Sequence, residues 1–211
     1  MFVSYKWLVL WTLWAGRFVR QPTPVRSLHD GSLVRGQYSA DGSYQRYTGI
    51  PYASSEHKYR FKAPGPAPKW DGVFEATREH IRCPQTNFKF LPPVLGTEDC
   101  LTINVYSPNH AWDGAPLPVM VFIHGGGFRE GSGSLLPLPK GVFCTCNYRL
   151  NVHGFLCLGI KRCSCNQDLR PSAALKWVQK NNPSVCGNPD NVTILGESCA
   201  SVSYHFTFAN V

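Results

Sequence analysis

The chain has 211 residues, of which 43% are hydrophobic and 16% are charged. This balance is typical of a globular protein and excludes a largely disordered chain. The net charge is +8, but the basic residues are scattered and their longest cluster is Lys161-Arg162, so the basic stripe of a nucleic-acid-binding protein is lacking. We therefore expect one globular domain without a nucleic-acid partner.

Residues 1–20 are predicted to be a signal peptide. Lys6 precedes the ten-residue apolar run WLVLWTLWAG, which fits the apolar core of a signal peptide. The run is shorter than the roughly 20 residues of a membrane-spanning helix, so we expect no stable membrane span. The alternative interpretation is a buried strand or a short helix. The prediction places a mature domain at 21–211 and the protein in the secretory-pathway lumen or outside the cell.

The first half of the domain contains short predicted strands. Segments 31–38 and 43–53 are expected to form strands and turns, and the proline-rich segment 62–72 is expected to be a loop. Residues 100–106 alternate in polarity, which predicts a half-buried strand. Its apolar face comprises Leu101, Ile103 and Val105, and its polar face comprises Thr102, Asn104 and Tyr106.

The second half has the pattern of a sheet covered by helices. Segments 119–123 and 141–148 are continuously apolar, as are strands buried on both faces. Segment 171–181 is predicted to be a helix, and segment 191–195 is predicted to be another buried strand. Because that strand begins at Asn191, in the sequence NVT, we expect Asn191 to be a poor glycosylation site. Strand, helix and strand in this order form a βαβ unit with parallel strands. The predicted fold class is α/β.

The sequence GESCA at 196–200 follows the last predicted strand. A strand, the pattern G-x-S-x-G and a helix together make a nucleophile elbow, in which a sharp turn exposes the serine. Here the nucleophile would be Ser198, and Ala200 replaces the second glycine.

A second motif, FIHGGGF at 122–128, follows another predicted strand. Backbone N–H groups in such a glycine turn can stabilise the oxyanion of a tetrahedral intermediate. The alternative is a phosphate-binding loop, but Ser132 stands where that motif requires lysine. The sequence therefore favours an oxyanion hole.

Several motifs in register resemble the N-terminal part of the animal carboxylesterase/cholinesterase-type (type B carboxylesterase) family, within the α/β-hydrolase superfamily. The resemblance extends from about Val25 to Val211. Its motifs, in order, are YTGIPYA, RFKAPGPAPKWDG, EDCLTINVYSP, LPVMVFIHGGGF, NYRLNVHGFL, AALKWVQKN and NPDNVTILGES.

This resemblance implies a truncated α/β-hydrolase fold, with a mostly parallel central sheet and antiparallel N-terminal strands, in a secreted hydrolase of small carboxylic esters. It implies that Ser198 is the nucleophile and that Glu197 lies beside it. The oxyanion hole would consist of the N–H groups of Gly126, Gly127 and Cys199. It also implies a disulfide between Cys83 and Cys100, and a loop of that length would stabilise the fold by roughly 3 kcal/mol.

The chain departs from the family pattern at the elbow, where the family usually has G-E-S-A-G. The segment between GSGS and NYRL is also short. The D-Q pair expected before AAL is absent, and Pro171-Ser172 stands nearby.

The chain has nine cysteines. The sequences CTC at 144–146 and CSC at 163–165 lack the C-x2-C spacing and histidine partners of a zinc site, so we predict no metal site. No cofactor is implied. Apart from Cys83, Cys100 and Cys199, the pairing of the cysteines is left open by the sequence: Cys144, Cys146, Cys157, Cys163, Cys165 and Cys186.

The proton-transfer partners of Ser198 are not found in the sequence. In this fold the acid and the histidine follow the serine along the chain, but the segment after Ser198 contains no Asp or Glu and only His205. In a regular helix His205 would lie about two turns, or roughly 10 Å, from Ser198. That separation is far beyond the reach of a general base. No histidine before the elbow is assigned as the base either.

Three hypotheses remain. The chain is an ester hydrolase that is catalytically incomplete, a non-catalytic adhesion or binding module, or a nonfunctional truncated product.

Overall fold

The computed structural model describes residues 21–86, 94–134, 141–156 and 171–200. The predicted signal peptide lies outside the described residues. The main sheet has six strands, in the spatial order β3 (Gln37–Tyr38), β4 (Tyr44–Pro51), β6 (Thr102–Pro108), β8 (Val142–Cys146), β7 (Leu117–Ile123) and β9 (Gly187–Gly196). A smaller sheet contains β1 (Arg26–Ser27), β2 (Leu33–Arg35) and β5 (Val73–Glu75).

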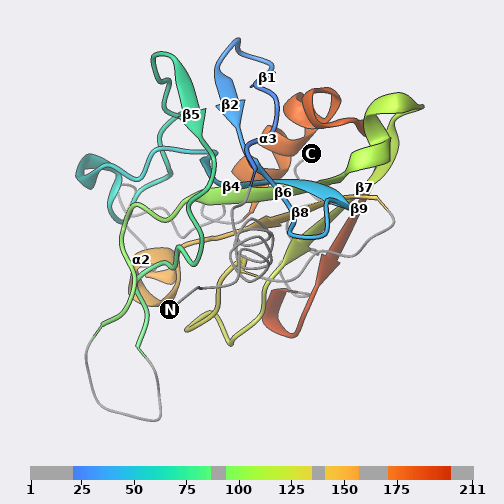
Figure 1. The fold of residues 1–211 in the computed structure, drawn as a ribbon. Coiled ribbons are helices and arrows are strands. Elements are labelled where there is room, and N and C mark those ends of the chain that lie inside the picture. Colours follow the sequence, from blue (N-terminus) through green and yellow to red (C-terminus); the bar gives the residue numbers. More distant parts are fainter. Residues whose placement is uncertain (1–20, 87–93, 135–140, 157–170, 201–211) are drawn as a thin grey trace, which may run out of the picture.

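The described helices are few and short. They are the α-helices α2 (Asn151–Phe155) and α3 (Ser172–Asn181) and the 3₁₀ helices η1 (His57–Tyr59), η2 (Asn109–Asp113) and η3 (Asn182–Val185). Figure 1 shows the small sheet and α3 on one side of the main sheet and α2 on the other. A hydrogen bond from the His29 N–H to Asn181 Oδ1, at 3.0 Å, joins the β1–β2 turn to the end of α3.

The main sheet has an antiparallel N-terminal part and a parallel part. The pairs β3–β4, β4–β6 and β6–β8 are antiparallel, while β8–β7 and β7–β9 are parallel. The expected division is confirmed, although in the described part of the chain three of the five pairs are antiparallel. Strands β8, β7 and β9 all run in one direction, as the βαβ interpretation requires, with β7 lying between β8 and β9.

The centre of the sheet is the hydrophobic core. All five residues of β8 are buried, and Val119, Val121 and Ile123 of β7 are at most 2% exposed. The expectation of a half-buried strand at 100–106 was wrong in one respect. Thr102 and Tyr106, on the supposedly outer face, are also buried, because Asn147 contacts Thr102 and the rings of Tyr44 and Phe143 pack against Tyr106.

Helix α3 matches the prediction closely. It buries Ala174, Trp177 and Val178, which lie three to four residues apart and therefore share one helix face. Pro171 precedes the helix. At this position proline is tolerated, because a backbone N–H there would have no partner within the helix.

Strand β9 is more exposed than predicted. In the described part of the chain it pairs only with β7 and forms an edge of the sheet. Asn191 is exposed, so the burial that was expected to prevent its glycosylation is not observed. Val192 and Ile194 still pack against the core, which keeps the strand in register.

No helix among the described residues is long and apolar enough to cross a membrane.

Candidate active site

Ser198 lies at a sharp turn between a strand and a helix. Strand β9 ends at Gly196, and Cys199 and Ala200 begin a helix. Ser198 has a φ of 52°, in the left-handed region that residues other than glycine rarely adopt. The Ala200 N–H donates to the Glu197 carbonyl at 3.0 Å and closes the turn. This geometry is that of a nucleophile elbow, with an exposed serine at its tip.

The glycine turn that follows β7 lies against this elbow. Strands β7 and β9 pair in parallel up to Ile123 and Gly196, so the residues following each strand emerge side by side. A Cβ added to Gly125 would lie 2.8 Å from the Glu197 carbonyl oxygen and 3.3 Å from Ser198 Cβ. Only a residue without a side chain allows this approach.

Gly126 and Gly127 are exposed and have φ values of 103° and 62°. The Gly126 carbonyl accepts hydrogen bonds from the N–H groups of Arg129 and Glu130, at 3.0 and 3.1 Å. These bonds close the turn next to the serine.

The carboxylesterase family model matches residues 22–210. The chain belongs to the carboxylesterase family. It is 40% identical over 207 residues to a cocaine esterase of Oryctolagus cuniculus, covering 87% of this chain and 39% of that protein. It is 41% identical over 188 residues to venom carboxylesterase-6 of Apis mellifera, covering 82% and 34%.

Solved structures agree with this assignment. A thermophilic PNB esterase superposes with a TM-score of 0.74 at 34% identity, over 85% of this chain and 40% of that one. The chain therefore has the α/β-hydrolase fold. It spans between about one third and two fifths of the length of these relatives.

The side chain of Cys199 makes a contact at the candidate site that was not predicted from the sequence. The Phe128 N–H donates a hydrogen bond to Cys199 Sγ at 3.3 Å, so the thiol joins the elbow to the glycine turn. The family resemblance implied a role only for the backbone N–H of Cys199. The only signal in the sequence was a cysteine where the family usually has alanine.

His124 belongs to the framework of the turn. Its ring stacks on that of Tyr148, with centroids 4.4 Å apart, and the Tyr148 hydroxyl donates to the His124 carbonyl at 2.7 Å. His124 Nδ1 lies 2.8 Å from the Gly125 carbonyl, to which it can only donate. Burial lowers the pKa of His124 and raises the pKa of Tyr148. The ring is therefore a packed group whose burial disfavours protonation.

No described histidine or carboxylate forms a hydrogen bond with the Ser198 hydroxyl. His80 is exposed, and its Nε2 lies 3.8 Å from Glu79 Oε2. The ring of His153 stacks on that of Phe61. His205 lies outside the described residues. Glu197 is exposed beside the nucleophile. The part of the chain that the structure describes also has no group of three or more His, Cys, Asp or Glu side chains able to hold a metal ion.

The predicted disulfide is confirmed. Cys83 and Cys100 are bonded, with Cα atoms 5.0 Å apart, and both are at most 1% exposed. Cys144 and Cys146 are free thiols buried in β8, and Cys186 is free and half-buried. Cys157, Cys163 and Cys165 lie outside the described residues.

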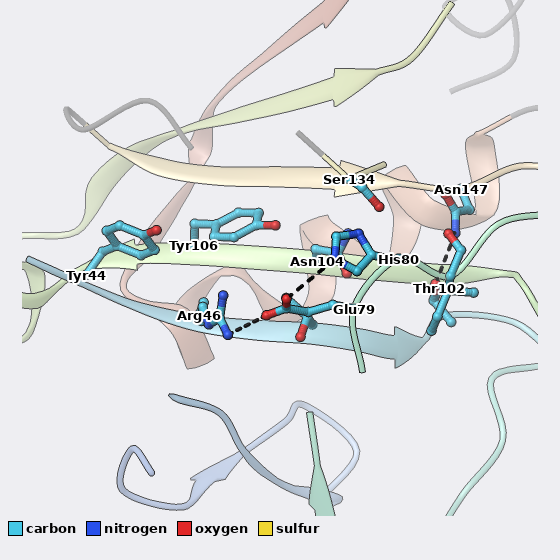
Figure 2. A pocket seen from close by; sticks show the side chains of 11 residues that line it. Tyr44, Arg46, Glu79, His80, Thr102, Asn104, Tyr106, Ser134 and Asn147 are labelled. Atoms are coloured by element: carbon cyan, nitrogen blue, oxygen red, sulfur yellow. Dashed lines mark hydrogen bonds and ion pairs between the residues drawn. The ribbon is translucent and has the colours of Figure 1, made fainter. Parts of the chain in front are cut away.

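A cavity of about 130 Å³ lies elsewhere in the molecule, over β4 and β6 (Figure 2). An ion pair between Arg46 and Glu79 borders it, and burial raises the pKa of Tyr106 in its wall to about 12. None of the predicted site residues lines this cavity, so it is separate from the candidate active site.

Proposed function

We propose that the chain carries the nucleophile and oxyanion hole of a serine carboxylic-ester hydrolase. Ser198 Oγ attacks the carbonyl carbon of a small carboxylic ester, and the alcohol leaves with a proton. Water then cleaves the acyl-Ser198 ester to the carboxylic acid. The N–H groups of Gly126, Gly127 and Cys199 stabilise the oxyanion that forms in each step.

The observation that carries this proposal is the left-handed conformation of Ser198 directly against Gly125. Strain of this kind persists where the surrounding structure holds it, and it clusters at functional sites. A binding or adhesion module needs no strained serine beside a glycine turn. The retention of both features therefore favours the hydrolase over the non-catalytic alternative.

Turnover by this chain is expected to be slow. A serine hydroxyl is a weak nucleophile without an adjacent base, and no described residue supplies one. In a comparable triad, loss of the base lowers turnover by on the order of 10⁶. The oxyanion hole and substrate binding can still make the reaction roughly 10³–10⁴ times faster than the same reaction in water.

The secretory pathway is the compartment we propose. The Cys83–Cys100 disulfide needs an oxidising environment to persist, and the apolar run near the N-terminus fits a signal peptide. The proposed partner is a small-molecule ester. Scattered basic residues do not support a nucleic-acid partner.

The proposal is tested with a fluorophosphonate probe on the full chain. Mass spectrometry should locate the adduct on Ser198, and Ser198→Ala should abolish it. Ser134→Ala, at another exposed serine, is the matched control and should leave labelling unchanged. An adduct elsewhere, or none, contradicts the assignment of the nucleophile.

Hydrolysis of 4-nitrophenyl acetate is measured in parallel. We expect a small rate that disappears in Ser198→Ala. Rapid turnover that disappears in this variant would show that a functional base is present and would contradict the proposed incompleteness.

A further inference from the structure

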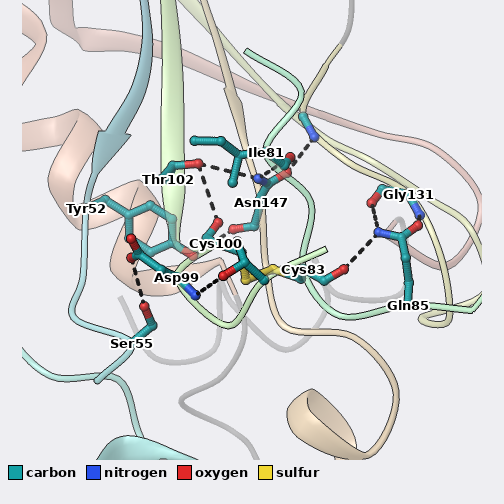
Figure 3. The surroundings of a disulfide bond; sticks show 12 residues. Tyr52, Ser55, Ile81, Cys83, Gln85, Asp99, Cys100, Thr102, Gly131 and Asn147 are labelled. Atoms are coloured by element: carbon teal, nitrogen blue, oxygen red, sulfur yellow. Dashed lines mark hydrogen bonds between the residues drawn. A yellow bond between two sulfur atoms is a disulfide. The ribbon is translucent and has the colours of Figure 1, made fainter. Parts of the chain in front are cut away.

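A buried glutamine joins the disulfide loop to the glycine turn (Figure 3). Gln85 is only 8% exposed. Its Nε2 donates to the Gly131 carbonyl at 2.9 Å, and its Oε1 accepts from the Gly131 N–H at 3.0 Å. Both backbone polar groups of Gly131 are therefore bound by one side-chain amide.

The same amide is anchored on the disulfide. Gln85 Nε2 also donates to the Cys83 carbonyl at 3.0 Å, and Cys83 is bonded to Cys100. The backbone of Gln85 exchanges two hydrogen bonds with Leu95, at 2.9 and 2.8 Å. With its backbone and amide both fixed, Gln85 has little freedom to follow a movement of the turn.

Gly131 in turn contacts the residues beside the nucleophile. A Cβ added to Gly131 would lie 2.3 Å from His124 Nδ1 and 2.8 Å from the Gly125 carbonyl oxygen. Gly125 packs on Glu197 and Ser198. A continuous series of contacts therefore runs from the disulfide through Gln85 and Gly131 to the elbow.

Other groups hold the first part of the turn. The Phe128 N–H bonds to Cys199 Sγ, and the Asn151 N–H bonds to the Phe128 carbonyl at 2.8 Å. The C-terminal end of the turn, at Gly131, receives its side-chain hydrogen bonds from Gln85. Loss of this amide would release that end while leaving the others tethered.

We propose that Gln85 is a positioning residue of the oxyanion hole, which holds the glycine turn against the elbow and couples that turn to the Cys83–Cys100 disulfide. The positioning role rests on the proposed function, because it assumes that Gly126 and Gly127 receive the oxyanion. The mechanical coupling between the turn and the disulfide does not depend on the proposed function. Reduction of the disulfide removes the anchor of Cys83, whose carbonyl accepts a hydrogen bond from the Gln85 amide, and the turn is expected to loosen with it.

The experiment measures hydrogen–deuterium exchange by mass spectrometry on the full chain, comparing wild type with Gln85→Ala. We expect exchange in peptides covering 125–131 to increase about tenfold, the effect of losing a hydrogen bond or two, while peptides of β6 and β8 are unchanged. Reduction of the wild-type disulfide should produce the same pattern. Gln45→Ala is the matched control, because Gln45 is also buried and hydrogen-bonded, to Asn109 and Tyr47, and should leave 125–131 unchanged.

Two results would overturn the coupling. One is unchanged exchange at 125–131 in Gln85→Ala, and the other is an equal increase in β6 and β8, which would indicate only a loss of global stability. If Gln85→Ala does not fold, Gln85→Glu serves instead, because an ionised glutamate can accept from the Gly131 N–H but cannot donate to its carbonyl. Gln85→Glu should show the same local increase in exchange at 125–131. The absence of that increase would equally overturn the coupling.

The rate of Ser198 labelling by the fluorophosphonate tests the positioning role separately. We expect labelling to slow in Gln85→Ala and after reduction, and to be unaffected in Gln45→Ala. A loosened turn with undiminished labelling would overturn the positioning role. Absence of labelling in the wild type would count against the proposed function, whereas the exchange result would still decide the coupling.

Discussion

The substitution Gly125→Ala tests the contact between the glycine turn and the elbow directly. The added Cβ would lie 2.8 Å from the Glu197 carbonyl oxygen and 3.3 Å from Ser198 Cβ. The first distance is too short for any real carbon–oxygen contact, and the obstructing atom belongs to the backbone. The turn and the elbow must therefore separate by several tenths of an ångström. Overpacking of this kind destabilises proteins by about 1–3 kcal/mol.

The chemical consequence should exceed the loss of stability. Oxyanion donors act only when they are aimed at the reacting oxygen, and loss of one donor costs about 10²–10³ in rate. We expect Ser198 labelling by a fluorophosphonate to fall by up to this factor, measured where the variant is fully folded. Urea denaturation measures the stability change.

Gly114→Ala is the matched control. A Cβ at Gly114 meets no atom within 4 Å, and the backbone there is extended. This replacement should leave labelling unchanged and leave stability equal or slightly higher, since alanine restricts the unfolded chain. Equal behaviour of Gly125→Ala and Gly114→Ala would refute the proposed approach of the two motifs.

Three further outcomes are expected. Ser198→Gly should raise the free energy of unfolding by about 1 kcal/mol relative to Ser198→Ala in urea denaturation, because glycine relieves the left-handed strain; no difference would argue against a strained elbow. Replacing both Cys83 and Cys100 by serine should lower that free energy by roughly 3 kcal/mol, and reducing agent should then have no further effect on unfolding. Burial lowers the pKa of His124, so the unfolded chain binds a proton at higher pH than the folded one, and stability is complete above about pH 6.5 and declines as the pH falls below it. His124→Gln should flatten that part of the stability–pH curve, and an unchanged slope would mean that other groups cause it.

Local patterns were enough to predict the elements of the candidate site. The elbow at Ser198 and the turn at Gly125–Gly127 each depend on glycines within a few residues, and both lie at the ends of strands whose apolar runs are evident. The Cys83–Cys100 bond was implied by family resemblance. Helix α3 was predicted from the spacing of its apolar residues. Apart from the disulfide, these features are encoded in contiguous sequence.

What the sequence did not reveal depends on neighbours distant in the chain. The burial of Thr102 and Tyr106 depends on contacts with Asn147, Tyr44 and Phe143. Asn191 is exposed on β9, which lies at the edge of the described sheet. The contact of Cys199 Sγ with the Phe128 N–H joins residues 71 positions apart. Gln85 reaches Gly131 across 46 positions. No local periodicity carries such information.

The two halves of a serine hydrolase site differ in the same way. The proposed nucleophile and oxyanion donors follow the ends of two neighbouring parallel strands, β7 and β9, and are held by contacts among described residues. The base and its acid follow the serine in chain order in this fold, so their placement depends on segments beyond the elbow. Among the described residues, the elbow and the glycine turn are brought together by the pairing of β7 with β9 and by the close approach of Gly125 to Glu197 and Ser198. Because the turn at Ser198 lies against Gly125, we expect labelling of Ser198 to respond to changes at Gly125 and Gln85 even where ester turnover is too slow to measure.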